Sequence, residues 1–242
     1  MSLESKQGLR AVAAMPVAER FVSVNGEGLH VGQFSTFVRF VGCNLACSYC
    51  DTKWACEADC PSEQMTPQEI LAFVQEQATP CVTLTGGEPT LQPLLPELLR
   101  CLVDGTDCFV ELETNGAVNL SSLAALRSEL YAQGKKSRIG FTLDCKSPSS
   151  GMDGRMIASN YELLGPDDCV KFVVGSEEDL KAARVVIEDW ELVDRCSVLL
   201  SPVAGEIDPA RIVAYLQERG LLKARVQLQL HKIIWPKQDR GV

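Results

Sequence analysis

Short runs of β-branched and aromatic residues alternate along the chain with longer segments whose apolar residues have helical spacing. The first run, at 34–40 (FSTFVRF), predicts a strand. Residues 66–69 (TPQE) then supply an N-cap, a proline at the first helical position and a capping-box glutamate. The apolar residues of 70–74 (ILAFV) continue at helical spacing. This part of the chain is therefore predicted to be a strand followed by a helix.

The alternation continues along the rest of the chain. Further strands are predicted at 82–85, 109–113, 139–143, 170–174, 197–200 and 226–230, and further helices at 94–103, 123–132, 177–190 and from 208–209 onward. Repeated strand–helix units predict a parallel sheet with helices packed against it. Six or seven such units indicate an α/β fold with a partial, incomplete TIM-like (β/α) barrel. We expect a single domain over 1–242, with an N-terminal extension at about 1–17 and an insertion at 51–65.

Polar segments follow the predicted strands at the same topological position. They are 85–89 (TGGEP), 113–116 (ETNG), 144–146 (DCK), 201–203 (SPV) and 230–232 (LHK). In barrels, the loops at the C-terminal ends of the strands build the active site. We therefore expect these segments to meet in one cavity.

Composition narrows the class of protein. The formal net charge is −9, and no dense Lys/Arg cluster is visible, which disfavours a nucleic-acid binder. No apolar run approaches the roughly 18 residues that a membrane span needs, and the N-terminus lacks the layout of a secretory signal. Eleven cysteines in a chain of this length indicate reduced thiols, some of them bound to metal, in a cytoplasmic protein.

Three of the cysteines form a C-x₃-C-x₂-C motif directly after the first predicted strand. Thiolates of Cys43, Cys47 and Cys50 on one short loop can hold three corners of a four-iron cluster, which leaves the fourth iron open for a small molecule. The alternative is a structural zinc site with Cys56 or Cys60 as the fourth ligand. The spacing favours the open cluster, with Cys56 and Cys60 as free thiols.

The cysteine motif, followed by 86–89 (GGEP) after the next strand, resembles the radical S-adenosylmethionine (SAM) superfamily. Segments 19–28, 37–52 and 229–242 are similar to the 7-carboxy-7-deazaguanine synthase family, and the resemblance runs from about residue 18 to 242. It implies a 4Fe-4S cluster, SAM and Mg²⁺ as cofactors. The implied reaction converts 6-carboxy-5,6,7,8-tetrahydropterin to 7-carboxy-7-deazaguanine with loss of ammonia. A homodimer and an electron donor such as flavodoxin or ferredoxin are implied as well.

The resemblance also assigns roles to individual residues. The residues expected to contact SAM are Tyr49, Cys50, Asp51, Gly86, Gly87, Glu88, Glu113, Asn115, Asp144, Cys145 and Lys146, with 201–203 near the adenosine. Those expected to contact the pterin are Val24, Asn25, Gly26, Glu27, Arg39, Thr85, His231 and Val242. Thr52 is expected to bind magnesium. Asn25 stands where the family more often has glutamine, and only Lys146 matches the Ser-Pro-Lys that many members have at 144–146.

Arg39 can be interpreted without the resemblance. It interrupts the apolar strand segment 37–40 (FVRF), so it needs an anionic partner or an outward-facing position. Its planar guanidinium suits bidentate binding of a carboxylate. His231 has two interpretations, a substrate contact or a core histidine with its hydrogen bonds satisfied.

Two alternative functions remain open from the sequence. A glycyl-radical-enzyme activase of the same superfamily shares the cysteine motif and GGEP, but Glu27, Arg39, the segment 50–52 (CDT) and the His231-Lys232 pair disfavour it. The second alternative is a non-catalytic metal protein, either a zinc-stabilised interaction domain or an electron-transfer module.

Overall fold

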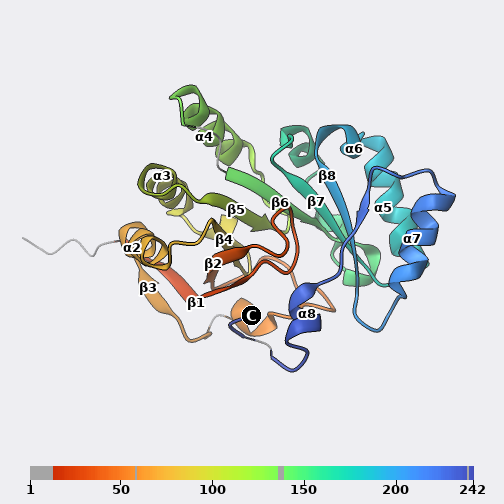
Figure 1. The fold of residues 1–242 in the computed structure, drawn as a ribbon, viewed down its shortest axis with the longest axis horizontal. Coiled ribbons are helices and arrows are strands. Elements are labelled where there is room, and N and C mark those ends of the chain that lie inside the picture. Colours follow the sequence, from red (N-terminus) through yellow and green to blue (C-terminus); the bar gives the residue numbers. More distant parts are fainter. Residues whose placement is uncertain (1–12, 58, 136–138, 239) are drawn as a thin grey trace, which may run out of the picture.

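A computed structural model describes residues 13–57, 59–135, 139–238 and 240–242. Within them, nine strands form one sheet in the order β3-β1-β2-β4-β5-β6-β7-β8-β9 (Figure 1). The strands are β1 (Met15–Val24), β2 (Phe34–Phe40), β3 (Glu63–Met65), β4 (Cys81–Gly86), β5 (Phe109–Thr114), β6 (Ile139–Cys145), β7 (Cys169–Val174), β8 (Ser197–Pro202) and β9 (Arg225–Val226). From β2 to β9 every neighbouring pair is parallel, whereas β1 is antiparallel to both β2 and β3. The sheet begins at β3 and ends at β9 without closing, which confirms the predicted partial barrel.

Helices cover the outer face of the curved sheet. The helices of the described residues are α1 (Lys53–Cys56), α2 (Pro67–Gln77), α3 (Leu95–Gly105), α4 (Ser121–Ala132), α5 (Glu177–Asp189), α6 (Leu192–Arg195), α7 (Pro209–Glu218) and α8 (Leu230–Ile234). The short 3₁₀ turns are η1 (Pro89–Leu91), η2 (Pro148–Ser150), η3 (Asp153–Arg155) and η4 (Ala158–Leu163). Figure 1 shows α2 to α7 around the strands, with α8 and the C-terminus apart from them below the sheet. None of the described helices is long and apolar enough to cross a membrane.

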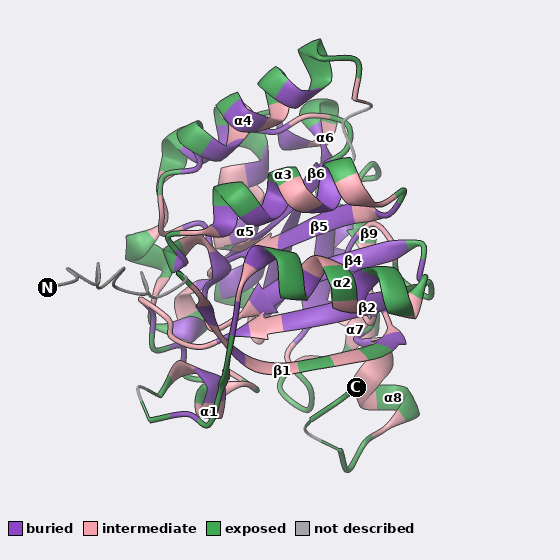
Figure 2. Ribbon diagram, turned by 90° about the vertical axis from the view of Figure 1, so that its left-hand side faces the viewer, coloured by how far each residue is buried: buried purple, intermediate pink, exposed green. Residues whose placement is uncertain are grey.

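The main core lies between the sheet and its covering helices, where the strands are buried along most of their length (Figure 2). In α3, Leu98, Leu99 and Leu102 are fully buried, because one stripe of an amphipathic helix faces the sheet. Helix α2 begins at the predicted capping box. The Thr66 hydroxyl accepts a hydrogen bond from the Glu69 N–H at 3.2 Å, and the Glu69 carboxylate accepts one from the Thr66 N–H at 2.8 Å.

The prediction of a last strand at 226–230 was wrong. The strand β9 contains only Arg225 and Val226, and the chain then leaves the sheet and enters α8 at Leu230. The reason is a set of contacts to the turn after β1. Gln227 exchanges two hydrogen bonds with the backbone of Gly28, at 2.8 and 3.0 Å, and the Leu230 N–H donates to the Gly26 carbonyl at 3.1 Å. These bonds replace the strand ladder that the apolar pattern had suggested.

The N-terminal part of the chain contributes more to the sheet than the pattern suggested. Strand β1 was not predicted, and it begins at Met15, inside the range assigned to an N-terminal extension. Residues 1–12 of that range lie outside the described residues. The segment 51–65, interpreted as an insertion, contains α1 and β3, and β3 pairs with the start of β1, with Met65 opposite Met15.

Candidate active site

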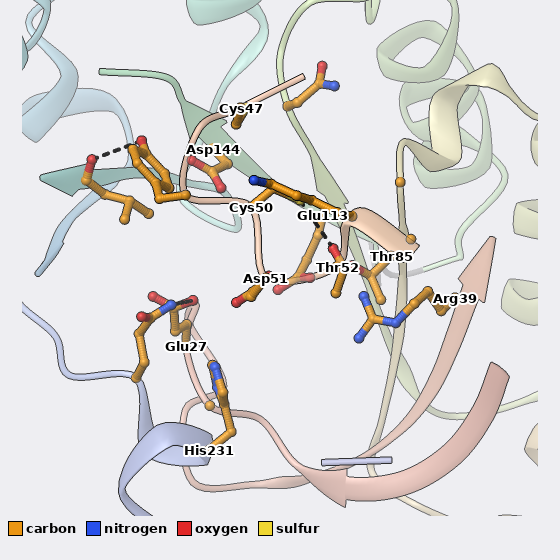
Figure 3. Close-up of a pocket in the computed structure, with 18 of the residues that line it drawn as sticks. Glu27, Arg39, Cys47, Cys50, Asp51, Thr52, Thr85, Glu113, Asp144 and His231 are labelled. Carbon is orange, nitrogen blue, oxygen red and sulfur yellow. Dashed lines mark hydrogen bonds between the residues drawn. The ribbon is translucent and has the colours of Figure 1, made fainter. Parts of the chain in front are cut away.

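A cavity of about 930 Å³ lies at the C-terminal ends of the parallel strands, where the polar segments were expected to meet. All but one of the site residues predicted from the sequence line this cavity. They are Val24, Asn25, Gly26, Glu27, Arg39, Cys43, Cys47, Tyr49, Cys50, Asp51, Thr52, Thr85, Gly86, Gly87, Glu88, Glu113, Asn115, Asp144, Lys146, His231 and Val242. Of the segment 201–203, only Val203 lines the cavity. In Figure 3, Cys47 and Asp144 are drawn at one end of this cavity and Glu27 and His231 at the other.

Cys145 is the exception. Its side chain is 4% exposed, and its sulfur lies 3.1 Å from the Tyr161 hydroxyl. Successive side chains of a strand point to opposite faces, so Asp144 and Lys146 reach the cavity while Cys145 turns into the core. The structure therefore gives Cys145 a packing role rather than a position in the cavity.

The cysteine loop runs from the end of β2 to the start of α1. Cys43, Cys47 and Cys50 are free thiols that line the cavity. The Leu45 N–H and the Asn115 amide donate to the Cys43 sulfur, at 3.4 and 3.6 Å. Hydrogen bonds to cysteine sulfurs are a recurring feature of iron–sulfur sites. Three thiols on one loop, with donors already directed at one of them, fit a cluster that leaves one iron without a protein ligand.

The zinc alternative would use Cys56 or Cys60 as a fourth ligand. Among the described residues, no three His, Cys, Asp or Glu side chains are grouped closely enough to bind a single metal ion. Cys56 lies beside the loop, and its thiol donates to the Thr52 carbonyl at 3.6 Å. Burial, together with the neighbouring Cys50 and Cys43, raises the pKa of Cys56 to about 12. Cys60 is buried, and its thiol contacts the Pro61 carbonyl instead.

The middle of the cysteine loop is held by the segment after β6 and by strand β7. The Ser48 hydroxyl donates to the Ser149 carbonyl at 2.6 Å, and the Tyr49 hydroxyl donates to the Val173 carbonyl at 3.3 Å. Ser149 is itself fixed, because its N–H donates to the fully buried Asp179 carboxylate at 2.9 Å. The loop position is therefore set by contacts from distant parts of the chain.

Glu88 closes the same end of the cavity and is fully buried. Its carboxylate accepts hydrogen bonds from the Thr114 hydroxyl at 2.8 Å, the Asn115 N–H at 2.7 Å, and the N–H and hydroxyl of Thr90. Burial raises the pKa of Glu88, while these hydrogen bonds act in the opposite direction. Both oxygens are thus satisfied by the protein itself.

The glycines before Glu88 have a steric reason. A Cβ at Gly87 would overlap the backbone carbonyl of Gly42, because the GGEP turn packs directly on the end of β2. The Glu88 N–H donates to that same Gly42 carbonyl at 2.7 Å. Gly87 is therefore required by backbone packing, whatever it contacts in a ligand.

Glu27 at the other end is bonded through one oxygen only. Its Oε2 accepts from the Lys171 ammonium at 3.0 Å and from the Gln229 amide at 3.1 Å. Oε1 is buried, and no described residue donates to it. Burial alone would raise the pKa of Glu27, but the Lys171 charge and these hydrogen bonds outweigh it and lower the pKa to about 2. Glu27 is therefore an anion that lines the cavity, and one of its two oxygens is buried without a direct hydrogen-bond donor among the described residues.

Lys171 was missed by the sequence analysis. It lies in β7, is 8% exposed, and reaches both Glu27 and Asp144, whose Oδ2 is 3.7 Å from its nitrogen. Asp144 also pairs with Lys146 at 2.9 Å. The signal was present in the strand CVKFVV, where a single lysine interrupts a buried apolar run just as Arg39 does in β2.

The floor beneath Glu27 is a buried polar network. The Asn25 amide donates to the Glu111 carboxylate at 3.1 Å and accepts from the Thr83 hydroxyl at 3.1 Å. The Thr142 hydroxyl donates to the other Glu111 oxygen at 2.6 Å. Burial and the nearby Glu113 raise the pKa of Glu111 to about 7, against the hydrogen bonds it accepts. The shorter amide of Asn25, noted in the sequence, is thus bonded to the core.

The C-terminal helix α8 closes the cavity over this floor. A Cβ at Gly26 would overlap the ring nitrogen of His231, so the turn after β1 needs glycine for His231 to pack there. Burial lowers the pKa of His231. Farther on, the Arg240 guanidinium lies 4.0 Å from the centre of the Trp54 ring, which attaches the C-terminal segment to α1.

Arg39 pairs with a residue that the sequence analysis did not name. Its Nε donates to Glu19 at 2.8 Å across the β1–β2 pair, and the two side chains are 13% and 16% exposed. This bond uses Nε alone, and in Figure 3 the terminal nitrogens of Arg39 point into the cavity. Arg39 therefore combines the two options set out from the sequence, because it has an anionic partner and still lines the site.

Thr52 lies between the cysteine loop and Arg39 in the close-up (Figure 3). Its hydroxyl is 3.7 Å from the Cys50 sulfur, and it precedes α1 without capping the helix through its side chain. The neighbouring Asp51 is half-exposed, with its carboxylate 3.7 Å from the Lys232 ammonium. A hydroxyl and a carboxylate here are oxygen ligands of the kind that magnesium accepts.

Comparisons with known proteins agree with this site. The model of the radical SAM superfamily matches residues 37–144. A 7-carboxy-7-deazaguanine synthase of Clostridium acetobutylicum is 45% identical over 226 residues, which is 93% of this chain and 98% of the relative. The enzyme of that name from Chlorobaculum tepidum is 36% identical over 95% of this chain and 98% of its own.

A solved structure supports the fold. The crystal structure of QueE from Escherichia coli aligns with a TM-score of 0.67 at 20% identity, and the alignment covers 89% of this chain and 94% of that one. At this identity the likeness concerns the fold alone. The full-length sequence similarity, together with the cysteine loop and the cavity built around it, shows that this chain belongs to the 7-carboxy-7-deazaguanine synthase family of radical SAM enzymes.

Proposed function

We propose that this enzyme converts 6-carboxy-5,6,7,8-tetrahydropterin to 7-carboxy-7-deazaguanine with loss of ammonia, in 7-deazapurine biosynthesis such as that of queuosine. One observation carries the proposal. The cavity that contains the three cysteines also contains a fixed cation, Arg39, and a carboxylate with a free oxygen, Glu27. A pterin with a carboxylate on one side and a guanidine-like edge on the other needs both groups.

The cysteine end is assigned to the cofactors. Cys43, Cys47 and Cys50 would hold a 4Fe-4S cluster, and the cluster with SAM, when bound, supplies radical chemistry at a carbon of the substrate. The residues of the chain bind these cofactors and orient them. Lys146 and Asp144 offer a cation and an anion to the charged groups of SAM, and the turn containing Gly87 lets the ligand approach the backbone closely.

The opposite end is assigned to the pterin. The terminal nitrogens of Arg39 suit the substrate carboxylate. Glu27 Oε1 accepts hydrogen bonds from the guanidine-like edge. His231 and the terminal carboxylate of Val242 would complete this end of the pocket. Thr52 and Asp51 lie between the two ends, and we assign magnesium to them, since a hard cation there reaches both protein and substrate oxygens.

The other site residues predicted from the sequence are assigned in the same way. On the SAM side we place Tyr49, Gly86, Glu88, Glu113 and Asn115, and on the pterin side Val24, Asn25, Gly26 and Thr85.

The glycyl-radical activase alternative is not favoured. Such an enzyme acts on a protein backbone and needs an open surface, whereas Glu27 is 9% exposed and α8 covers its side of the cavity. The family membership established above also agrees with a small substrate. The non-catalytic alternatives are not favoured either, because the relatives that match nearly the full chain are named as synthases, and an electron carrier does not need the fixed Arg39 and Glu27.

The remaining parts of the proposal concern partners and location. We expect a single-electron donor such as flavodoxin or ferredoxin to reduce the cluster. All eleven cysteines are free, in keeping with a reducing cytoplasm. Exposed Ile233 and Ile234 on α8 offer apolar surface that a homodimer would cover.

The deciding experiment is an anaerobic assay of the reconstituted protein. With SAM, a one-electron reductant, magnesium and the carboxy-tetrahydropterin, we expect 7-carboxy-7-deazaguanine and ammonia in equal amounts. A protein that binds about four irons and SAM but leaves the pterin unchanged would contradict the proposed substrate. Failure to bind iron would contradict the assignment of the cysteine loop itself.

A further inference from the structure

We infer that Lys171 is a positioning residue shared by both ligand sites, which aims Glu27 at the pterin and Asp144 at SAM. This inference rests on the proposed function, because that function assigns the two carboxylates to different ligands. Lys171 itself is assigned to no ligand, and it is the side chain that joins the two ends of the cavity.

The geometry places one ammonium between two carboxylates that come from distant parts of the chain. Lys171 lies in β7, directly beside Asp144 in the β6–β7 register, and its nitrogen is 3.7 Å from Asp144 Oδ2. Glu27 comes from the turn after β1, and its Oε2 is 3.0 Å from the same nitrogen. In Figure 3, Asp144 is drawn nearer the cysteine loop and Glu27 nearer His231, so the two carboxylates belong to opposite ends of the cavity.

The free oxygens of the two carboxylates show what this arrangement achieves. Glu27 Oε1 and Asp144 Oδ1 are both buried, and within the described chain neither has a hydrogen-bond partner. Lys171 therefore engages one oxygen of each carboxylate, and the other oxygen of each has no donor within the described chain. A buried acceptor without a donor is unfavourable, so each free oxygen is a place where a ligand donor gains binding free energy.

Only a cation fulfils this role. Lys171 is largely buried, and burial alone would lower its pKa, but the charges of Glu27 and Asp144 raise the pKa well above the ordinary value. Without that charge, two carboxylates would remain in one poorly solvated cavity, and their repulsion would turn them away from their ligands. Lys146, which pairs only with Asp144, cannot replace Lys171 at Glu27.

The test uses Lys171→Met, which removes the charge and keeps most of the side-chain volume. Affinities for SAM and for the carboxy-tetrahydropterin are measured separately on the cluster-loaded enzyme without reductant, so that no turnover occurs. We expect both to weaken roughly tenfold to a hundredfold, the range for hydrogen bonds to charged groups. Glu27→Gln should weaken only the pterin and Asp144→Asn only SAM.

Double mutants separate positioning from a general structural effect. Because Lys171 acts through the carboxylates, Lys171→Met should weaken the pterin little further in a Glu27→Gln background, and SAM little further in an Asp144→Asn background. Arg127→Met is the matched control. It breaks another buried ion pair, to Asp168 at 2.6 Å, whose residues do not line the cavity, so it should lower stability and leave both affinities unchanged.

Several outcomes would overturn the inference: an unchanged affinity for either ligand in Lys171→Met, fully additive losses in the double mutants, or equal losses in Arg127→Met. If Lys171→Met does not fold, Lys171→Gln, which keeps a donor without the charge, is subjected to the same measurements. Wild-type protein that fails to bind the pterin would instead refute the proposed substrate, and the SAM measurements would still test Lys171.

Discussion

A buried carboxylate lies at each end of the cavity, and the two differ in how their oxygens are hydrogen-bonded. At the cysteine end, Glu88 accepts hydrogen bonds at both oxygens from Thr90, Thr114 and Asn115, all of them uncharged donors. At the far end, Glu27 is held through one oxygen by Lys171, and the other oxygen has no partner among the described residues.

This difference distinguishes a carboxylate that stabilises the structure of the site from one that can bind a ligand. A carboxylate satisfied on both oxygens fixes a loop, and Glu88 fixes the GGEP turn onto the end of β5. A carboxylate satisfied on one oxygen has binding capacity left over, because a buried acceptor gains free energy from any donor that reaches it. The comparison therefore predicts that substitutions at the two ends have different consequences.

The largest effect is expected at the cysteine loop itself. Replacing Cys43, Cys47 or Cys50 by Ala should abolish binding of the cluster and cleavage of SAM together, since three thiolates are the minimum set here. Iron and sulfide analysis after anaerobic reconstitution measures the loss. Cys56→Ala and Cys60→Ala are the controls and should keep a full cluster. A full cluster in Cys47→Ala would remove the loop from the site.

A paired substitution tests the comparison directly. Glu88→Gln should lower the free energy of unfolding by about 1–3 kcal/mol, because one amide cannot accept all the hydrogen bonds that the carboxylate accepts. Glu27→Gln should weaken the pterin, and it should also lower stability, because it leaves the buried Lys171 without its closest counter-charge. Glu88→Gln should leave the pterin affinity unchanged. Chemical denaturation and equilibrium binding measure the two quantities, and an equal loss of pterin affinity in both variants would show that the distinction between the two ends is wrong.

Substitution of Arg39 tests the pterin end of the cavity, where Arg39 is a second charged group besides Glu27. Arg39→Ala should raise the pterin requirement, at a cost on the order of 2–5 kcal/mol, the range for breaking a buried charge pair, without changing SAM affinity. Lys should rescue only partly, since an ammonium lacks the planar fork. In the Ala variant, a substrate without its carboxylate should bind little worse than the natural one. If the loss of affinity caused by Arg39→Ala and the loss caused by removing the substrate carboxylate are additive, Arg39 does not bind that carboxylate.

The smallest effect is expected at Glu111, in the polar network beneath the pterin end of the cavity, where its titration should make stability depend on pH. The pKa of Glu111 is raised to about 7 from 4.5, so the folded state binds its proton more tightly than the unfolded state. Its contribution is fully present below pH 4.5 and is lost as pH rises through about 7, by a few kcal/mol at most. Glu111→Gln should flatten this part of the curve in denaturation series. An unchanged slope would contradict the raised pKa.

The strand–helix alternation was predictable because its signals are local. The predicted strands from 34–40 to 197–200 agree with the observed ones to within two residues at each end, since β-branched runs and capping boxes act over a few residues. The final strand could not be predicted in this way. Its alternating apolar pattern is typical of a strand, but Gln227 and Leu230 form hydrogen bonds with Gly28 and Gly26, some 200 residues earlier in the chain.

The sequence by itself determined the chemistry that this protein can perform. Three features could be interpreted without coordinates: the cysteine spacing, the glycines before Glu88 and the lone Arg39 in an apolar strand. Each of them restricts the local backbone or requires a partner. The tertiary structure alone decided which groups remain available. Whether a carboxylate has a free oxygen depends on donors from other strands, as Lys171 shows for Glu27 and Asp144. The lone lysine in the apolar strand β7 indicates that a partner is needed, but which carboxylates it pairs with is set by packing in three dimensions.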